Sequence, residues 1–177
     1  MSEPRLLGIS GSLRRGSWNT RLLAEAFRAF GPATTERADL QLPLFNEDIE
    51  DETGLPEPVL RLCAQIRAAD GVIIATPEYN KMIPGVLKNA LDWISRDKPQ
   101  PLIGKPVALI STAGRSGGEV AQFTLRHALA SFNTRLLQGP AFVVPGTDTA
   151  FDESHRLISE AQRKSLARLM QRLREAL

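Results

Sequence analysis

The sequence predicts a three-layer α/β fold in which helices cover both faces of one parallel sheet. Short apolar runs alternate with longer amphipathic stretches, which is the pattern of strands and covering helices in such a sheet. The 177 residues suffice for one domain with a sizeable core, so we expect a single domain over residues 1–177. With 42% hydrophobic and 24% charged residues, the composition is ordinary for a globular protein.

The first third of the chain predicts two strands around one helix. Residues 5–10 form an apolar run typical of a buried strand, and residues 19–30 carry apolar side chains at helical spacing until Gly31-Pro32 ends the helix. A weaker strand is expected at 34–38. Residues 41–58 are rich in acids and prolines, which predicts an irregular surface loop.

The middle of the chain predicts two helices around the clearest strand. Residues 57–69 have helical spacing, and Cys63 falls on their apolar face, so a buried packing thiol is expected. Residues 71–76 are short, apolar and β-branched, as expected of a buried strand. A helix over 84–95 follows, with Pro84 tolerated in its first turn.

The last part of the chain predicts two strands and two helices. A strand at 107–111 precedes a helix over 117–132. A fifth strand is expected within 136–144, interrupted by Gly139-Pro140, and a terminal helix over 153–176. Sheets of this kind bind ligands beyond the carboxyl ends of their strands, at the topological switch point.

Charge and cysteine content argue against several classes of protein. The net charge is only +2 and basic residues do not cluster, so we expect no nucleic-acid partner. Cys63 is the only cysteine, which excludes an intrachain disulfide. No apolar stretch approaches the ~20 residues of a spanning helix, so we expect no membrane insertion and a cytoplasmic location. No cluster has metal-ligand spacing, and no metal is expected.

The first candidate loop, residues 11–20, opens the first predicted helix. Gly11 and Gly16 permit close approach of a ligand, and Arg14 and Arg15 supply positive charge. The free N–H groups and the dipole of the helix favour an anion here, and a phosphate monoester fits that chemistry. Hydroxyl and amide donors come from Ser12, Ser17, Asn19 and Thr20. Alternatively, Ser17 or Asn19 merely caps the helix and the arginines are solvated.

Two further loops follow strand ends at the same edge of the sheet. Residues 76–85 include Pro77-Glu78-Tyr79-Asn80, whose main-chain groups could match the alternating N–H and C=O groups of a flavin edge, with Tyr79 against the ring. An ordinary strand-to-helix turn with Tyr79 exposed is the alternative. Residues 111–118 are rich in glycine, which permits close approach, but taken alone they suit a flexible connection capped by Ser116.

No side chain is expected to act as a catalytic acid or base. His127 and His155 fall on or near predicted helices, away from the three loops, so we expect structural or solvated roles for them. Ser10 and Ser12 have no evident base beside them, which argues against a hydrolase. The chemistry is therefore expected to come from a bound cofactor.

Together these segments resemble the NADPH-dependent FMN reductase family of flavodoxin-like proteins, which includes quinone, chromate and azo-dye reductases. The resemblance spans about residues 5–138 and implies a flavodoxin-like sandwich with a five-stranded parallel sheet in the order 2-1-3-4-5. The motifs that carry it are Gly11-Ser12-Leu13-Arg14 with Ser17 and Asn19, Pro77-Glu78-Tyr79-Asn80, residues 84–93, Gly104-Lys105-Pro106 and Gly117-Gly118.

The resemblance implies bound FMN and a set of residues that hold it. Expected on the phosphate side are Ser12, Arg14, Ser17, Asn19 and Thr20, and Ser10 is counted with the cofactor-binding residues. Expected on the ring are Pro77, Glu78, Tyr79 and Asn80, with Ser111, Thr112 and Gly114 on another side. Lys88, Asn89, Asp92 and Trp93 are expected to stabilise the loop or a subunit contact. Dimers or tetramers are implied, with the site near a subunit interface.

The reaction implied by the resemblance is a ping-pong NAD(P)H oxidation. NADPH or NADH passes hydride to N5 of FMN, which then reduces a quinone, a flavin or a similar small-molecule acceptor. The sequence leaves open the preferred nicotinamide, as well as whether Arg14, Arg15 or Arg115 meets a 2′-phosphate. The alternative is a flavodoxin-type electron carrier without its own NAD(P)H activity. Such carriers tend to be strongly acidic, whereas this chain is not.

Overall fold

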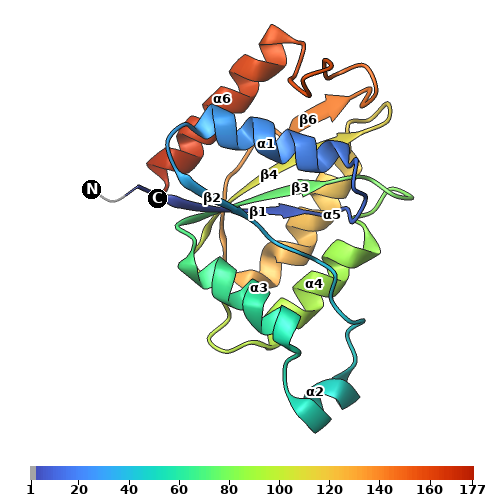
Figure 1. The fold of residues 1–177 in the computed structure, drawn as a ribbon, viewed down its shortest axis with the longest axis vertical. Coiled ribbons are helices and arrows are strands. Elements are labelled where there is room, and N and C mark those ends of the chain that lie inside the picture. Colours follow the sequence, from blue (N-terminus) through green and yellow to red (C-terminus); the bar gives the residue numbers. More distant parts are fainter. Residues whose placement is uncertain (1–2) are drawn as a thin grey trace.

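One parallel sheet with helices on both faces makes up the computed structural model, which describes residues 3–177 (Figure 1). The strands are β1 (Arg5–Ser10), β2 (Thr34–Arg37), β3 (Gly71–Thr76), β4 (Pro106–Ala113), β5 (Arg135–Leu136) and β6 (Phe142–Pro145). Their order is β2-β1-β3-β4-β5, and β6 also pairs with β4. The predicted three-layer architecture and the predicted strand order are confirmed.

Two short strands share the fifth position of the sheet. β5 pairs with the start of β4 at Pro106 and Val107, and β6 pairs with its end from Ile110 to Ala113. Gly139-Pro140 lies between them, as the sequence predicts. Proline has no N–H to donate and glycine weakens a strand, so the edge strand is split in two.

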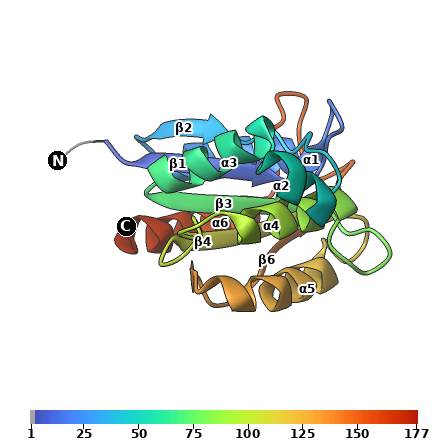
Figure 2. The same ribbon diagram turned by 90° about the horizontal axis from the view of Figure 1, so that it is seen from below.

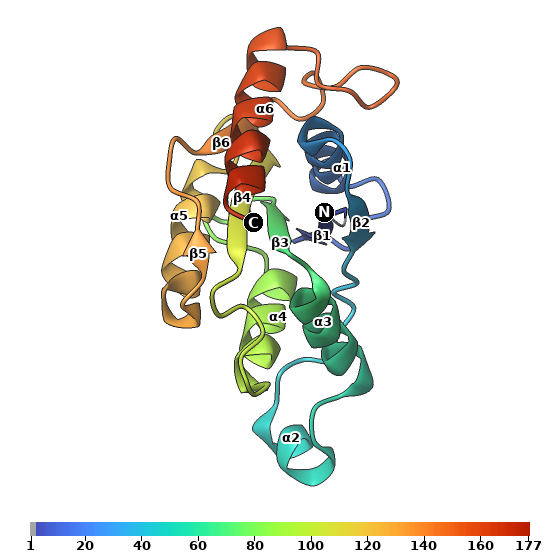
Figure 3. The ribbon, with the colours of Figure 1, turned by 90° about the vertical axis from the view of Figure 1, so that its left-hand side faces the viewer.

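The helices form two layers, one on each face of the sheet (Figures 2 and 3). They are α1 (Trp18–Phe30), α2 (Glu47–Thr53), α3 (Glu57–Ala68), α4 (Gly85–Arg96), α5 (Glu119–Leu129) and α6 (Glu160–Glu175), with a 3₁₀ turn at Ala130–Phe132. One apolar cluster packs α1 and α6 on one face, and a second packs α3, α4 and α5 on the other.

Alternating residues of the strands supply both clusters. Val72 and Ile74 of β3 point to the α3–α4–α5 side, whereas Ile73 points to the α1–α6 side. Helix α1 lies so close to β1 that a Cβ on Gly8 would sit 2.6 Å from Cζ of Phe27. A larger residue at this position would therefore force the ring of Phe27 to move, and glycine lets α1 pack closely on this strand.

Two predicted segments differ most from the structure. Residues 41–58 contain α2, which projects from the body of the molecule (Figure 1). Its acidic first turn suits the helix dipole, and Asn46 caps it by accepting from the N–H of Asp48. The last helix begins at Glu160 rather than at 153, because Ser159 caps it and an isolated bridge between Phe151 and Leu157 closes the preceding loop.

The carboxyl ends of β1, β3 and β4 meet at one edge of the sheet, where the three candidate loops leave it (Figure 1). Strand β4 extends two residues beyond its predicted end, to Ala113. Helix α5 begins at Glu119 rather than at 117, because Gly117 and Gly118 both have positive φ. Within residues 3–177, no helix combines the length and apolarity that crossing a membrane requires.

Candidate functional site

A cleft opens where the loops after β1, β3, β4 and β6 converge. Nine of the thirteen predicted site residues line it, and the other four lie beside it. The complete lining is Ser12, Arg14, Ser17, Trp18, Asn19, Pro77, Glu78, Tyr79, Thr112, Ala113, Gly114 and Thr147. Its position beyond the carboxyl ends of the strands is where doubly wound sheets bind their ligands.

The loop after β1 presents an anion-binding helix terminus to the cleft. Ser17 begins α1, and its Oγ accepts from the N–H of Thr20 at 3.4 Å. The exposed Arg14 reaches the cleft wall, and the first turn of α1 contains no acidic residue. Amide donors, a guanidinium and a first helical turn without an acidic residue suit a phosphate, so this end of the cleft fits the phosphate of FMN.

The side-chain amide of Asn19 forms its hydrogen bonds within the protein. The side chain is buried, its Nδ2 donates to the carbonyl of Thr112 at 2.9 Å, and its Oδ1 accepts from the N–H of Thr112 at 3.1 Å. This paired bond fastens the start of α1 to the end of β4. Residue type shows that an amide is present, but only the fold shows where its hydrogen bonds go.

The loop after β3 is a tight turn that projects beside the cleft. Tyr79 and Met82 form an isolated antiparallel bridge, and Asn80 and Lys81 between them have positive φ. Tyr79 lines the cleft and is 50% exposed. Asn80 is exposed and does not line the cleft.

The carboxylate of Glu78 faces away from solvent and joins two loops. It accepts from the N–H of Ala121 at 3.1 Å and from Oγ of Ser116 at 3.2 Å, and Nζ of Lys81 lies 3.5 Å away. Burial alone would raise the pKa of Glu78, but these hydrogen bonds and the lysine charge outweigh burial and hold it below its ordinary value. The carboxylate is therefore ionised at neutral pH.

Three other predicted residues lie next to the cleft without lining it. Ser10 accepts from the hydroxyl of Thr20 at 3.0 Å, and both face a neighbouring groove. Ser111 is buried, donates to the carbonyl of Gly117 and accepts from Gln122. These hydroxyls are satisfied within the protein and stabilise the loops.

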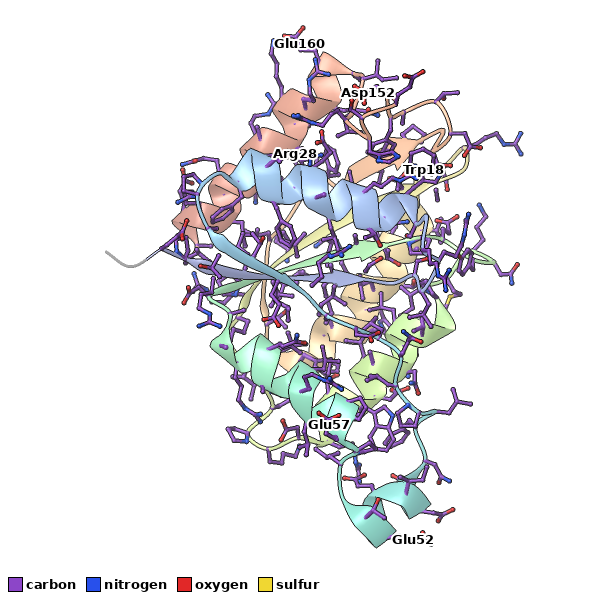
Figure 4. The ribbon with its side chains drawn as sticks, viewed as in Figure 1. Trp18, Arg28, Glu52, Glu57, Asp152 and Glu160 are labelled. Atoms are coloured by element: carbon purple, nitrogen blue, oxygen red, sulfur yellow. The ribbon has the colours of Figure 1, made fainter. Side chains whose placement is uncertain are left out.

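Three lining residues are not among the thirteen predicted ones: Trp18, Ala113 and Thr147. Only Thr147 lies outside the three candidate loops, and no motif in its own segment pointed to a site. Trp18 stacks on Phe151 with ring centroids 5.1 Å apart, and the guanidinium of Arg21 lies over its ring. Figure 4 shows Trp18 at the end of α1 next to the loop that carries Asp152. His155 lies 6.5 Å from Trp18, so its predicted distance from the first loop is wrong. Ala113 lies between the predicted Thr112 and Gly114, within the segment expected beside the ring.

The remaining reactive groups lie outside the cleft. Burial, and then a hydrogen bond with Asp97, raise the pKa of the Cys63 thiol to about 12, which keeps it a protonated packing group. His127 is on α5, away from the cleft lining. Residues 3–177 hold no cluster of three or more potential metal ligands. The described side chains thus provide binding and orientation, while the redox chemistry must come from a cofactor.

The sheet order and a cleft beyond the carboxyl ends of the strands, at the switch point, define a flavodoxin-like protein. More particularly, the chain belongs to the NADPH-dependent FMN reductase family, whose model matches residues 4–149. The predicted membership is confirmed, and with it an oxidoreductase that uses FMN and takes NAD(P)H as co-substrate. The electron-carrier alternative is not supported.

Relatives agree with this assignment. An NAD(P)H-dependent FMN reductase of Pseudomonas aeruginosa is 43% identical over 172 residues, which cover 96% of this chain and 92% of that one. A quinone reductase of Escherichia coli (strain K12) is 42% identical over 149 residues, covering 81% and 79%. The solved structure of the flavoenzyme NAD(P)H:(acceptor) oxidoreductase FerB from Paracoccus denitrificans matches with a TM-score of 0.84 at 28% identity, covering 97% and 96%.

Proposed function

We propose that this chain is a quinone reductase that holds FMN in the cleft and reduces its acceptor by a ping-pong mechanism in the cytoplasm. The observation that supports this proposal most strongly is the N-terminus of α1, which has no acidic residue in its first turn and has Arg14 beside it. It lies opposite the two loops that carry Tyr79 and Gly114. In this arrangement the phosphate lies at α1 and the ring lies between the loops after β3 and β4.

The protein contributes binding, orientation and access. Arg14 and the amides of α1 hold the phosphate. Pro77 is buried and fixes the backbone beneath the ring, while Glu78 and Asn19 hold the surrounding loops. When bound, FMN would supply the two-electron chemistry between NAD(P)H and the acceptor. The proton that completes quinol formation can come from solvent at the open side of the cleft.

A quinone is the acceptor we propose. A relative from Burkholderia, 38% identical over 167 residues, is a 2-hydroxy-1,4-benzoquinone reductase, and the Escherichia coli relative is a quinone reductase. The half-exposed Tyr79 leaves room for a planar molecule to stack at the open side of the cleft. If donor and acceptor use the same open face, they must bind in turn. Double-reciprocal plots against NADH or NADPH should then be parallel at several quinone concentrations, whereas intersecting lines would contradict the ping-pong order.

Replacing Arg14 with alanine is expected to weaken FMN binding roughly 10- to 100-fold, since hydrogen bonds to charged groups contribute about 1.5–3 kcal/mol. The measurement is a titration of the apoprotein with FMN, in which quenching of flavin fluorescence reports binding. Arg15→Ala is the matched control, because Arg15 is exposed on the same loop but does not line the cleft. If the two variants bound FMN with equal affinity, the proposal that Arg14 and this loop bind the phosphate would be contradicted.

We also propose that two copies of the chain associate through α4 and α5. A largely apolar hollow of about 910 Å³ lies there, lined by residues that include Met82, Phe123 and His127. Met82 and Phe123 line it and are 53% and 65% exposed, so a two-fold axis through the hollow would bury these apolar side chains of the two copies against each other. Because Met82 belongs to the turn that carries Tyr79, the interface would lie next to the cleft.

Phe123→Glu is expected to convert the associated protein to monomer, because it places a charge in an apolar contact. The molar mass measured by light scattering after size exclusion checks this. Leu60→Glu is the control: Leu60 is 49% exposed on α3, outside the hollow, and its replacement should leave the mass unchanged. A monomeric unmodified protein at micromolar concentration would overturn the proposal.

A further inference from the structure

Helix α5 starts without a capping side chain of its own. Its N-cap residue is Gly118, with φ of 90°, and it makes no side-chain capping hydrogen bond. A Cβ on Gly118 would lie 2.9 Å from Cβ of Ser111, so no larger residue fits there. The orphan amides of the first turn must therefore find acceptors from elsewhere in the chain.

Glu78 supplies that acceptor from another loop. Its Oε2 accepts from the N–H of Ala121 in the first turn of α5. Its Oε1 accepts from Oγ of Ser116, which in turn accepts from the N–H of Gly118. One carboxylate, whose side chain is 7% exposed, thus caps α5 and fixes the loop in front of it.

The two segments that Glu78 joins are the two sides of the proposed ring site. Pro77 and Tyr79, its neighbours in sequence, line the cleft on one side. Ala113 and Gly114 line it on the other, and the chain leads from them through Ser116 directly to α5. A displacement of α5 or of the turn at Tyr79 would change the width of the cleft at the ring end and leave the phosphate end at α1 as it is.

We propose that Glu78 is a positioning residue that sets the spacing of the two loops around the flavin ring and acts through Ser116 and the first turn of α5 rather than by contact of its carboxylate with the flavin. The inference rests on the proposed placement of FMN in this cleft. It assigns to Glu78 a role different from the ring contact expected from the sequence.

The test compares FMN with riboflavin, which has the same ring but no phosphate. Glu78→Gln keeps the size of the side chain but replaces the carboxylate by an amide that offers one acceptor oxygen instead of two. We expect its dissociation constants for FMN and riboflavin to rise by the same factor, about tenfold, because a hydrogen bond to a charged acceptor is lost at the ring end only. Arg14→Ala should instead weaken FMN alone and leave riboflavin unchanged.

Ser159→Ala is the matched control for a purely structural effect. Ser159 caps α6 by accepting from the N–H of Gln162, away from the cleft lining, so its loss lowers the melting temperature without touching the ring site. Ser116→Ala serves as the second variant should Glu78→Gln fold poorly. It removes one of the donors to Glu78 and should show a smaller effect of the same pattern.

The outcomes separate the inference from the proposed function. If the unmodified protein binds neither flavin, the proposed function fails. If the unmodified protein binds FMN, and Glu78→Gln and Ser116→Ala bind FMN and riboflavin as tightly as it does, the proposed function stands and the role of Glu78 is overturned. A loss confined to FMN in Glu78→Gln would also overturn it, because the carboxylate would then be acting at the phosphate. If Ser159→Ala lost as much affinity for the two flavins as Glu78→Gln, the effect of Glu78→Gln would reflect lower overall stability, and the role of Glu78 would be overturned.

Discussion

Replacing Trp93 with alanine is expected to lower the free energy of unfolding by about 3–5 kcal/mol, the usual cost of removing a buried aromatic side chain. Trp93 on α4 is completely buried. Its Nε1 donates to the carbonyl of Pro43 at 2.8 Å, and the ring of Phe45 meets it edge-on with centroids 4.9 Å apart. The variant therefore opens a cavity and releases the segment that leads to α2.

Urea denaturation of the FMN-saturated protein, followed by circular dichroism, measures this loss. Trp93→Phe retains much of the buried ring but not the N–H donor. Because Nδ2 of Asn89 also donates to the carbonyl of Pro43, this variant should lose only about 1 kcal/mol. Leu60→Ala, at an exposed site on α3, is the control for truncation without a cavity. If Trp93→Ala lowered the free energy of unfolding by less than about 1 kcal/mol, α4 would not be holding this segment in place.

The sheet could be predicted because its signals are local. The apolar run at 71–76 coincides with β3, which is buried along its whole length. The loop after β1 and the cap at Ser17 follow from glycine and hydroxyl positions within ten residues of each other. Periodicity and turn chemistry act over such distances, and they were sufficient for most strands and helices and for the edge at which the cleft lies. The strand order, in contrast, was implied by the resemblance to the family.

The segments that were wrongly predicted are determined by distant partners. Residues 43–45 are held by Asn89 and Trp93, and Glu50 of α2 pairs with Arg96, all on a helix more than forty positions later. The loop before α6 is fastened at Leu157, whose N–H donates to the buried carboxylate of Glu25 on α1. Nothing in the local pattern of either segment shows these contacts.

Within the site, residue types predicted the donors but not their use. Asn19 on α1, Glu78 after β3 and Ser111 on β4 all line or border the cleft, as predicted. Their polar atoms are nevertheless engaged by the backbone or by side chains of a second loop. A sequence shows which groups can hydrogen-bond. It does not show whether a ligand or another part of the chain will satisfy them. Where the partner is another part of the chain, a substitution should change cofactor binding by altering the shape of the cleft.

Asn19→Leu is the clearest case and should affect stability and cofactor binding together. Leucine has a similar size but leaves both the N–H and the carbonyl of Thr112 without this partner, at a cost of about 1–3 kcal/mol for each buried group left unsatisfied. Because the pair fastens α1 to the end of β4, FMN affinity should fall as well. Urea denaturation with and without FMN measures both quantities.

Asn19→Asp separates the hydrogen bonds from side-chain size. Its carboxylate can still accept from the N–H of Thr112, but it faces the carbonyl of Thr112 and lies at the proposed phosphate site, so burial and repulsion should raise its pKa. A raised carboxyl pKa destabilises the fold once the pH exceeds the ordinary value for Asp, so this variant should approach the unmodified protein at low pH and lose stability as pH rises. Asn19→Leu should show no such recovery. If both variants kept the stability and FMN affinity of the unmodified protein at pH 7, the link between α1 and β4 would have no role in shaping the cleft.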